Sequence, residues 1–168
     1  MPRTSLHTLL RAALKVRSRA YAPYSGFQVG AAVLANGRIY AGCNVENSSF
    51  PLSVCAERNA VAMAVAAGAR KIDAVAIAGG TKRPAAPCGG CRQVLAEFCP
   101  PDTPLVYATP GGQSVTTTVG ALLPSSFGPG DLMEAAREST GTKRGPAGIS
   151  RSAARFRGTR RSGRRRSP

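Results

Sequence analysis

Three cysteines have a spacing that suits a metal ion. Cys88 and Cys91 enclose two glycines, and Cys55 lies 33 residues before Cys88. Two thiolates separated by two residues can bind the same ion, and zinc prefers four ligands in a tetrahedron. The only histidine, His7, is far from these motifs in the sequence and is expected to be a surface or packing residue. Three protein ligands and an open fourth position are typical of a catalytic zinc ion, not a structural one.

Two charged residues beside Cys55 suit the same chemistry. In the first turn of a helix that begins near Cys55, the carboxylate of Glu57 can face the open position of the metal without binding it. A metal that lowers the pKa of water, with a carboxylate that moves protons, favours hydrolysis. Three thiolates leave a zinc centre negatively charged, and Arg58 can return positive charge to it. Without the thiols, Glu57 could simply complement the helix dipole, and Arg58 could be an exposed helix arginine.

Other interpretations of the cysteines remain open. The Cys88–Cys91 pair could be a redox centre, or half of a structural zinc site completed by Cys43 or Cys99. A redox pair leaves Cys55 unexplained, and Cys43 and Cys99 have a simpler interpretation as buried free thiols. Five cysteines, an odd number, in a chain without a secretory signal argue against a disulfide framework.

The elements that must position these residues follow from the spacing of apolar and turn-forming residues. Asn36–Gly37 between two strand-like runs predicts a hairpin, whose strands are antiparallel. Helices between the later strands favour parallel crossovers, so we expect an α/β fold with three α/β/α layers and a mixed five-stranded sheet. The expected elements are a helix over 5–20, strands over 27–35 and 38–45, a helix over 55–67, a strand over 71–80, a helix over 91–99, a strand over 103–109, a possible strand over 111–119, an irregular segment over 120–132 and a helix over 132–138.

The charge is distributed unevenly along the 168 residues. Residues 1–138 hold 13 Lys/Arg and 8 Asp/Glu, whereas residues 139–168 hold 10 Lys/Arg and no acid. We therefore expect one catalytic domain over 1–138 and a disordered Arg/Ser/Gly-rich tail over 139–168 that can bind polyanions non-specifically. No apolar run reaches 18 residues and the N-terminus lacks a signal-peptide core, so we expect no membrane span and a cytoplasmic location.

Several motifs together resemble a known family. Cys-Ala-Glu at 55–57 and Pro-Cys-Gly-Gly-Cys at 87–91 resemble the motifs of zinc-dependent nucleobase deaminases. The segments YSGFQVGAAV, GCNVENSSF, CAERNA and PCGGCRQVLAEF, in this order and spacing, are similar to small homotetrameric cytidine deaminases. ALLPSSFGPGDL is similar to the end of that family's domain, so the likeness spans about residues 6–132.

This resemblance implies an enzyme of pyrimidine salvage. It would hydrolyse cytidine and deoxycytidine to uridine and deoxyuridine, release ammonia, bind one Zn²⁺ per subunit and act as a homotetramer without needing nucleic acid. The resemblance also implies a role for each site residue: Cys55, Cys88 and Cys91 hold zinc, Glu57 shuttles protons, Phe27 packs against the pyrimidine, Asn44 and Glu46 bind a ribose hydroxyl, the N–H of Ala56 meets the base carbonyl, Arg58 offsets thiolate charge, and Phe127 is lent to a neighbouring subunit.

Plainer roles and other functions compete with this assignment. Phe27 and Phe127 could be packing residues, Asn44 a turn former and Glu46 a solvated loop acid. The chain could deaminate a polynucleotide gripped by the tail, or be a non-enzymatic zinc-stabilised module that contacts nucleic acid. Glu57 argues against the non-enzymatic module, because a structural zinc site has no use for a carboxylate at an open position.

Overall fold

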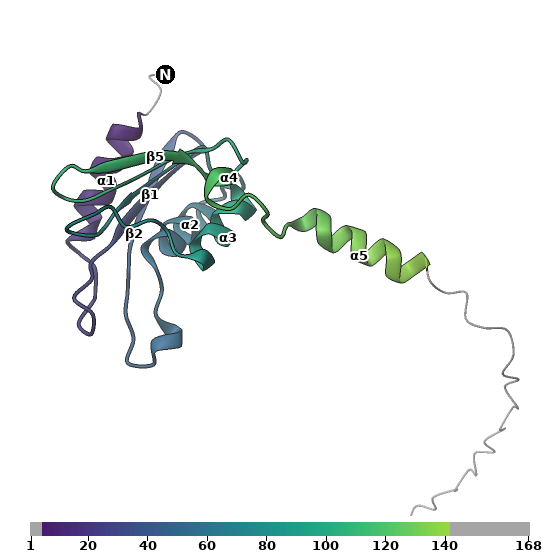
Figure 1. Ribbon diagram of the computed structural model, residues 1–168, viewed down its shortest axis with the longest axis horizontal. Helices are drawn as coiled ribbons and strands as arrows, with labels where there is room; N and C mark the ends of the chain where they lie inside the picture. The colour runs from purple at the N-terminus through teal and green to yellow at the C-terminus, as the bar shows by residue number, and fades with distance from the viewer. Residues whose placement is uncertain (1–4, 142–168) are drawn as a thin grey trace, which may run out of the picture. The chain divides into compact units, whose positions relative to one another are not determined.

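The structure is a computed structural model that describes residues 5–141 (Figure 1). Its regular elements alternate between helices and strands, much as the residue pattern predicts. In order they are α1 (Leu6–Arg17), β1 (Gly30–Ala35), β2 (Arg38–Cys43), the 3₁₀ turn η1 (Phe50–Leu52), α2 (Ala56–Ala66), β3 (Ala74–Ala78), α3 (Gly89–Phe98), β4 (Pro104–Ala108), β5 (Ser114–Thr118), α4 (Val119–Leu122) and α5 (Pro129–Gly141).

The five strands form one mixed sheet in the order β2-β1-β3-β4-β5. The β1–β2, β1–β3 and β4–β5 pairs are antiparallel, and β3 and β4 are parallel. Asn36 and Gly37 have φ values of 51° and 71°, the left-handed conformation that a two-residue hairpin turn requires. The predicted hairpin and mixed five-stranded sheet are confirmed.

Helices cover both faces of the sheet, so the expected three layers are confirmed (Figure 1). Successive strand residues point to opposite faces. In β3, for example, Ala76 packs towards α1, whereas Val75 and Ile77 pack towards α2 and α3. The α1 face is lined mainly by alanines, and the α2–α3 face carries larger aliphatic side chains.

Close backbone approach fixes α2 on the sheet. A Cβ atom at Gly42 of β2 would lie 2.6 Å from the backbone nitrogen of Ala60 and 2.9 Å from the carbonyl oxygen of Ala56. The side chain of Asn59 also donates to the carbonyl of Cys43, at 2.8 Å. Because Gly42 has no side chain, the first turns of α2 lie directly against the end of β2.

Three expectations about element boundaries were wrong. α3 begins at Gly89, two residues before the expected start, with Cys88 as its N-cap. The segment 120–132, expected to be irregular, contains most of α4 and the start of α5. The loop before α2 contains the short turn η1, which the sequence did not indicate.

The described residues belong to two units, one ending at Asp131 and one beginning at Leu132. Helix α5 continues to Gly141, past the predicted domain boundary at residue 138, which stays a prediction. The predicted tail lies almost entirely outside the described residues. Among residues 5–141, no helix has the length and apolar character needed to cross a membrane.

Candidate active site

Three thiols meet where two helices begin. Cys55 is the N-cap of α2, Cys88 is the N-cap of α3, and Cys91 lies buried in the first turn of α3. Their sulfur atoms all lie within 4.8 Å of one another, and the Sγ atoms of Cys55 and Cys88 are 4.0 Å apart. The unpaired N–H groups of both helix starts favour negative charge at this point. The spacing-based prediction of a thiol cluster is therefore confirmed.

The three sulfurs are an ionisable set suited to zinc. The thiol of Cys91 and the guanidinium of Arg58 lower the pKa of Cys55 to about 5, because both stabilise its thiolate. The pKa of Cys91 is raised, chiefly because its proton bridges to Cys55. Soft thiolates held within one ion's reach are ligands that zinc prefers, and three of them leave one coordination position open. The donor set therefore fits a catalytic zinc ion.

Glu57 is the one charged residue that is buried among the described residues. Its relative exposure is 5%, and it lies in the first turn of α2, two residues after Cys55. Burial raises the pKa of its carboxyl, since the charged form loses water. A raised pKa favours a carboxyl that can both accept and return a proton.

Arg58 points back towards the thiols. Its Nη2 donates to the carbonyl of Ser53 at 3.0 Å and lies 3.7 Å from the Sγ of Cys55. The guanidinium is therefore held beside the cluster rather than extended into solvent. This geometry favours charge compensation over the alternative of an exposed helix arginine.

A cavity of about 190 Å³ lies beside the thiols. It is lined by residues just before β1, just after β2, at the starts of α2 and α3, in β3 and in the loop after β3. Its lining residues are Phe27, Val29, Asn44, Cys55, Ala56, Glu57, Ile77, Ala85, Ala86 and Cys88. Six of the predicted site residues therefore line this cavity: Phe27, Asn44, Cys55, Ala56, Glu57 and Cys88.

Asn44 makes two hydrogen bonds to the backbone of the segment just before β1. Its Oδ1 accepts from the N–H of Val29 at 2.8 Å, and its Nδ2 donates to the carbonyl of Phe27 at 2.9 Å. Asn44 thus fixes the segment that carries the Phe27 ring. One hydrogen of its amide stays available, because the Nδ2 group has two.

Glu46 holds the turn just before Phe27. Its carboxylate accepts from the N–H groups of Tyr24 at 2.9 Å and Ser25 at 3.2 Å, and from the Ser25 hydroxyl. The hydroxyl of Ser25 in turn accepts from the N–H of Phe27 at 2.9 Å. These bonds, led by the one from the Ser25 hydroxyl, lower the pKa of Glu46. Glu46 also lines a neighbouring cavity of about 370 Å³ with Tyr24, Phe50 and Cys55.

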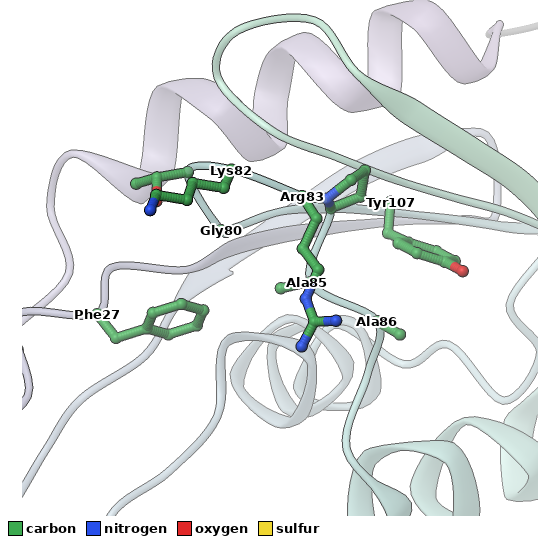
Figure 2. Close-up of a pocket in the computed structure, with 9 residues that line it drawn as sticks. Phe27, Gly80, Lys82, Arg83, Ala85, Ala86 and Tyr107 are labelled. Atoms are coloured by element: carbon green, nitrogen blue, oxygen red, sulfur yellow. The ribbon is translucent and has the colours of Figure 1, made fainter.

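A larger cavity, about 570 Å³, also borders Phe27 (Figure 2). It shares Phe27, Ala85 and Ala86 with the cavity beside the thiols. In the view of Figure 2 the Arg83 side chain lies between the rings of Phe27 and Tyr107. No thiol and no acid lines this cavity, so its size does not make it the reaction site.

Phe127 is not brought into the site of its own chain. Its exposed fraction is 59%, and it lines none of the three cavities just described. Its carbonyl accepts from the Nε2 of Gln93 at 2.6 Å, which holds the backbone there against α3.

Three residues of this region were not predicted from the sequence. Ser25 joins Glu46 to Phe27, and Arg92 and Gln93 follow the ligand Cys91 and bind backbone carbonyls. The position of Arg92 and Gln93 within PCGGCRQVLAEF was the available signal. Ser25 lies in a turn, where serine is common because its hydroxyl binds nearby backbone groups, so the sequence did not indicate a role in the site.

An ion at the thiol cluster would keep one position for water or substrate, and the buried carboxyl of Glu57 lines the same cavity as Cys55 and Cys88. The fold and the site together define a zinc-dependent hydrolytic enzyme. Comparisons with known proteins make the class more specific. Residues 3–107 match the family model described as the cytidine and deoxycytidylate deaminase zinc-binding region.

Relatives that match over nearly their whole length support this match. The cytidine deaminase of Sporosarcina psychrophila is 47% identical over 131 residues, which are 77% of this chain and 96% of that protein. The crystal structure of cytidine deaminase from Burkholderia pseudomallei has 46% identity and a TM-score of 0.71, covering 74% of this chain and 100% of that one. The cytidine deaminase structure from Mycobacterium tuberculosis has 38% identity and a TM-score of 0.64, over 74% and 98% of the two chains. The chain belongs to the cytidine and deoxycytidylate deaminase family.

Proposed function

We propose that this enzyme hydrolyses cytidine to uridine with release of ammonia, and that deoxycytidine is accepted in the same way. The observation that carries the proposal is the buried carboxyl of Glu57, which shares one cavity with Cys55 and Cys88 of the three clustered thiols. Family membership and the cytidine deaminases among the relatives support the same reaction.

Cys55, Cys88 and Cys91 would hold one Zn²⁺ per subunit. When bound, zinc supplies Lewis acidity, which lowers the pKa of water at the open position. The chain supplies the surroundings for this chemistry. Two helix N-termini stabilise the thiolates, and Arg58, 3.7 Å from the Cys55 sulfur, reduces the negative charge that three thiolates bring.

Glu57 would move the protons of the reaction. Its carboxylate accepts a proton from the attacking water and delivers it to N3 of the cytosine ring. It then takes the remaining proton of the hydroxyl added at C4 and passes it to the exocyclic amine, so that the C4 carbonyl forms as the C4–N bond breaks and ammonia leaves. A raised pKa suits this double task, because the same group must take a proton and give it up at one pH.

The remaining site residues would orient the nucleoside. The ring of Phe27 packs against the pyrimidine, and the N–H of Ala56, the first residue of α2, has no partner within its helix and is free to meet the base carbonyl. Asn44 and Glu46 would bind a ribose hydroxyl, using the second amide hydrogen and the carboxylate, respectively. Holding the base and sugar in this way lowers the entropic part of the barrier.

We propose a homotetramer in which Phe127 completes a neighbour's site. The exposure of Phe127 and its absence from its own chain's cavities support this. Exposed apolar side chains near the β2–α2 loop, Phe50 and Leu52 among them, are also typical of a subunit contact. If Phe127 acts in trans, mixing Glu57→Gln subunits with Phe127→Ala subunits restores activity that neither variant has alone. Mixed tetramers no more active than the two parents refute the role in trans.

We propose that the basic tail is not needed for turnover and that it can bind polyanions. Its ten Lys/Arg without an acid support non-specific electrostatic binding. Truncation after Glu138 should leave oligomer mass and turnover nearly unchanged, and should reduce retention on a heparin column. A collapse of the oligomer would contradict this. The five free cysteines support a cytoplasmic location, where thiols stay reduced.

The central test measures cytidine absorbance together with a zinc count per subunit. We expect loss of the cytosine band, release of ammonia, and about one zinc per chain. The Glu57→Gln variant should keep zinc and fold but lose turnover by several orders of magnitude, because it removes the proton carrier. Unchanged deamination by this variant would refute the assigned role, and a chain that binds no zinc would refute the metal site.

A further inference from the structure

We propose that Arg92 and Gln93 are positioning residues. They connect the zinc-binding loop, here the residues up to Pro87 and Cys88 before α3, to the segment 119–127 that carries Phe127. This inference rests on the proposed roles of Cys88 and Phe127. Neither Arg92 nor Gln93 lines the cavity beside the thiols. Both follow Cys91 directly on α3, and both side chains donate to backbone carbonyls far away in the sequence.

Arg92 joins two segments of backbone. Its Nε donates to the carbonyl of Pro87 at 2.9 Å, and its Nη1 donates to the carbonyl of Leu122 at 3.0 Å. Pro87 is fully buried and precedes the ligand Cys88. The carbonyl of Leu122 is at the end of α4, where a carbonyl has no partner within the helix. The planar guanidinium fixes the distance between these two carbonyls, because its donors have a rigid arrangement.

The segment 119–127 runs back along α3. Near the far end of α3, the N–H of Val119 donates to Thr103 at 3.1 Å, and the N–H of Gly120 donates to Pro101 at 2.8 Å. A Cβ atom at Gly120 would lie 2.8 Å from the Cβ of Pro101, so the contact is tight. Near the start of α3, Arg92 holds Leu122 and Gln93 holds Phe127. The segment therefore leads Phe127 towards the metal-bearing end of α3.

Arg92 and Gln93 have different hydrogen-bond partners, so their removal should have different effects. Gln93 makes one such bond, to the carbonyl of Phe127 at 2.6 Å. Arg92 contacts both the zinc-binding loop and the segment. Removing Arg92 should therefore loosen zinc and displace Phe127, whereas removing Gln93 should displace Phe127 alone. Removing groups that support metal ligands typically lowers metal affinity about 10- to 100-fold.

Four single variants of the full-length zinc-loaded protein separate these effects: Arg92→Ala, Arg92→Lys, Gln93→Ala and Arg70→Ala. Arg70 is the matched control, since it also donates to two backbone carbonyls, those of Val65 and Ala69, but at the other end of α2. The measurements are the rate of zinc transfer to a colorimetric chelator, KM and kcat for cytidine, and the thermal midpoint.

We expect Arg92→Ala to release zinc about tenfold faster and to raise KM, with Arg92→Lys between it and wild type. Gln93→Ala should raise KM severalfold with zinc release unchanged. Arg70→Ala should lower the thermal midpoint without changing zinc release or KM. If Arg92→Ala fails to fold, Arg92→Lys decides the question by the same zinc-release measurement.

Wild-type zinc release in the Arg92 variants would overturn the proposal. Equal acceleration by Arg70→Ala would also overturn it, because the effect would then be general destabilisation. Faster zinc release in Gln93→Ala would overturn the division of roles. A wild-type chain without zinc or deaminase activity would instead refute the proposed function, so the two failures are distinguishable.

Discussion

The close contact between β2 and α2 makes Gly42→Ala a test of how the site is positioned. The added methyl would lie 2.6 Å from the nitrogen of Ala60, 2.8 Å from the Cβ of Asn59 and 2.9 Å from the carbonyl oxygen of Ala56. Two of these are backbone atoms of α2, which cannot rotate away as a side chain can. The helix that carries Glu57 and begins after Cys55 must therefore move away from the sheet.

The size of this effect follows from the contact distances. Ordinary carbon contacts begin near 3.4 Å, so α2 must move by about 0.8 Å at Ala60. Overpacking of this kind costs about 1–3 kcal/mol of folding free energy, which lowers the thermal midpoint by roughly 3–10 °C. A misplacement of about 1 Å can lower turnover on the order of 100-fold. We expect kcat/KM for cytidine to fall about 10- to 100-fold.

Gly90→Ala is the matched control, because it lies between two ligands but has no atom within 4 Å of its added Cβ. Kinetics with cytidine, the zinc content and thermal unfolding should be measured for both variants. Gly90→Ala should keep activity within about twofold, since an open helix position accepts alanine. Equal activities and midpoints for Gly42→Ala and wild type would refute the argument that close approach of β2 sets the site.

Three further substitutions or treatments have defined outcomes. Ser25→Ala removes the hydroxyl that joins Glu46 to Phe27. Loss of this hydrogen bond should weaken substrate binding by about 1 kcal/mol, so KM should rise about fivefold while kcat changes little. A change in kcat alone would contradict this. In metal-free protein, alkylation of Cys55 should be half-maximal near pH 5, whereas Cys99, whose pKa burial raises to about 12, should not react at pH 8. Arg58→Gln should raise the pKa of Cys55, because the guanidinium beside the sulfur is lost. During acidification the variant should therefore release zinc at a higher pH than wild type. An unchanged dependence of zinc release on pH would exclude charge compensation.

Local patterns predicted most of the fold because most of its elements are specified locally. Asn36–Gly37 adopts the left-handed turn expected of this pair, and the alternation in β1 and β3 places successive residues on opposite faces. Helix α4 has only four residues and depends on tertiary bonds, such as that from Gly120 to Pro101. A sequence window around α4 contains no sign of these bonds. Gly89–Gly90 likewise resembles a loop in the sequence, although these glycines form the start of α3.

The meeting of the thiols could be predicted where spacing along one helix start was enough. Cys88 and Cys91 converge because three residues span about one helical turn, and Glu57 lies near Cys55 because only one residue separates them. The clamp of Asn44 on Phe27 joins residues 17 positions apart, and that of Arg92 on Leu122 joins residues 30 positions apart. These contacts depend on the tertiary arrangement of the strands and loops, which the spacing of residues along one element does not specify.

The capping of the helices explains why zinc binding should increase the stability of the fold. The N-cap residues Ser5 of α1 and Thr118 of α4 accept backbone N–H bonds, whereas the N-cap residues Cys55 and Cys88 make no capping side-chain bond. A hydroxyl cap contributes about 1 kcal/mol, so the two metal helices lack this stabilisation until their thiolates bind an ion.

Cys55→Ser separates the two contributions, because serine can cap α2 but is a poor zinc ligand. In chelator-treated protein the variant should be about 1 kcal/mol more stable than wild type, measured by urea unfolding. With zinc added the order should reverse, since the metal stabilises only the chain that binds it. A metal-free variant no more stable than metal-free wild type would refute this account of why thiols occupy both cap positions.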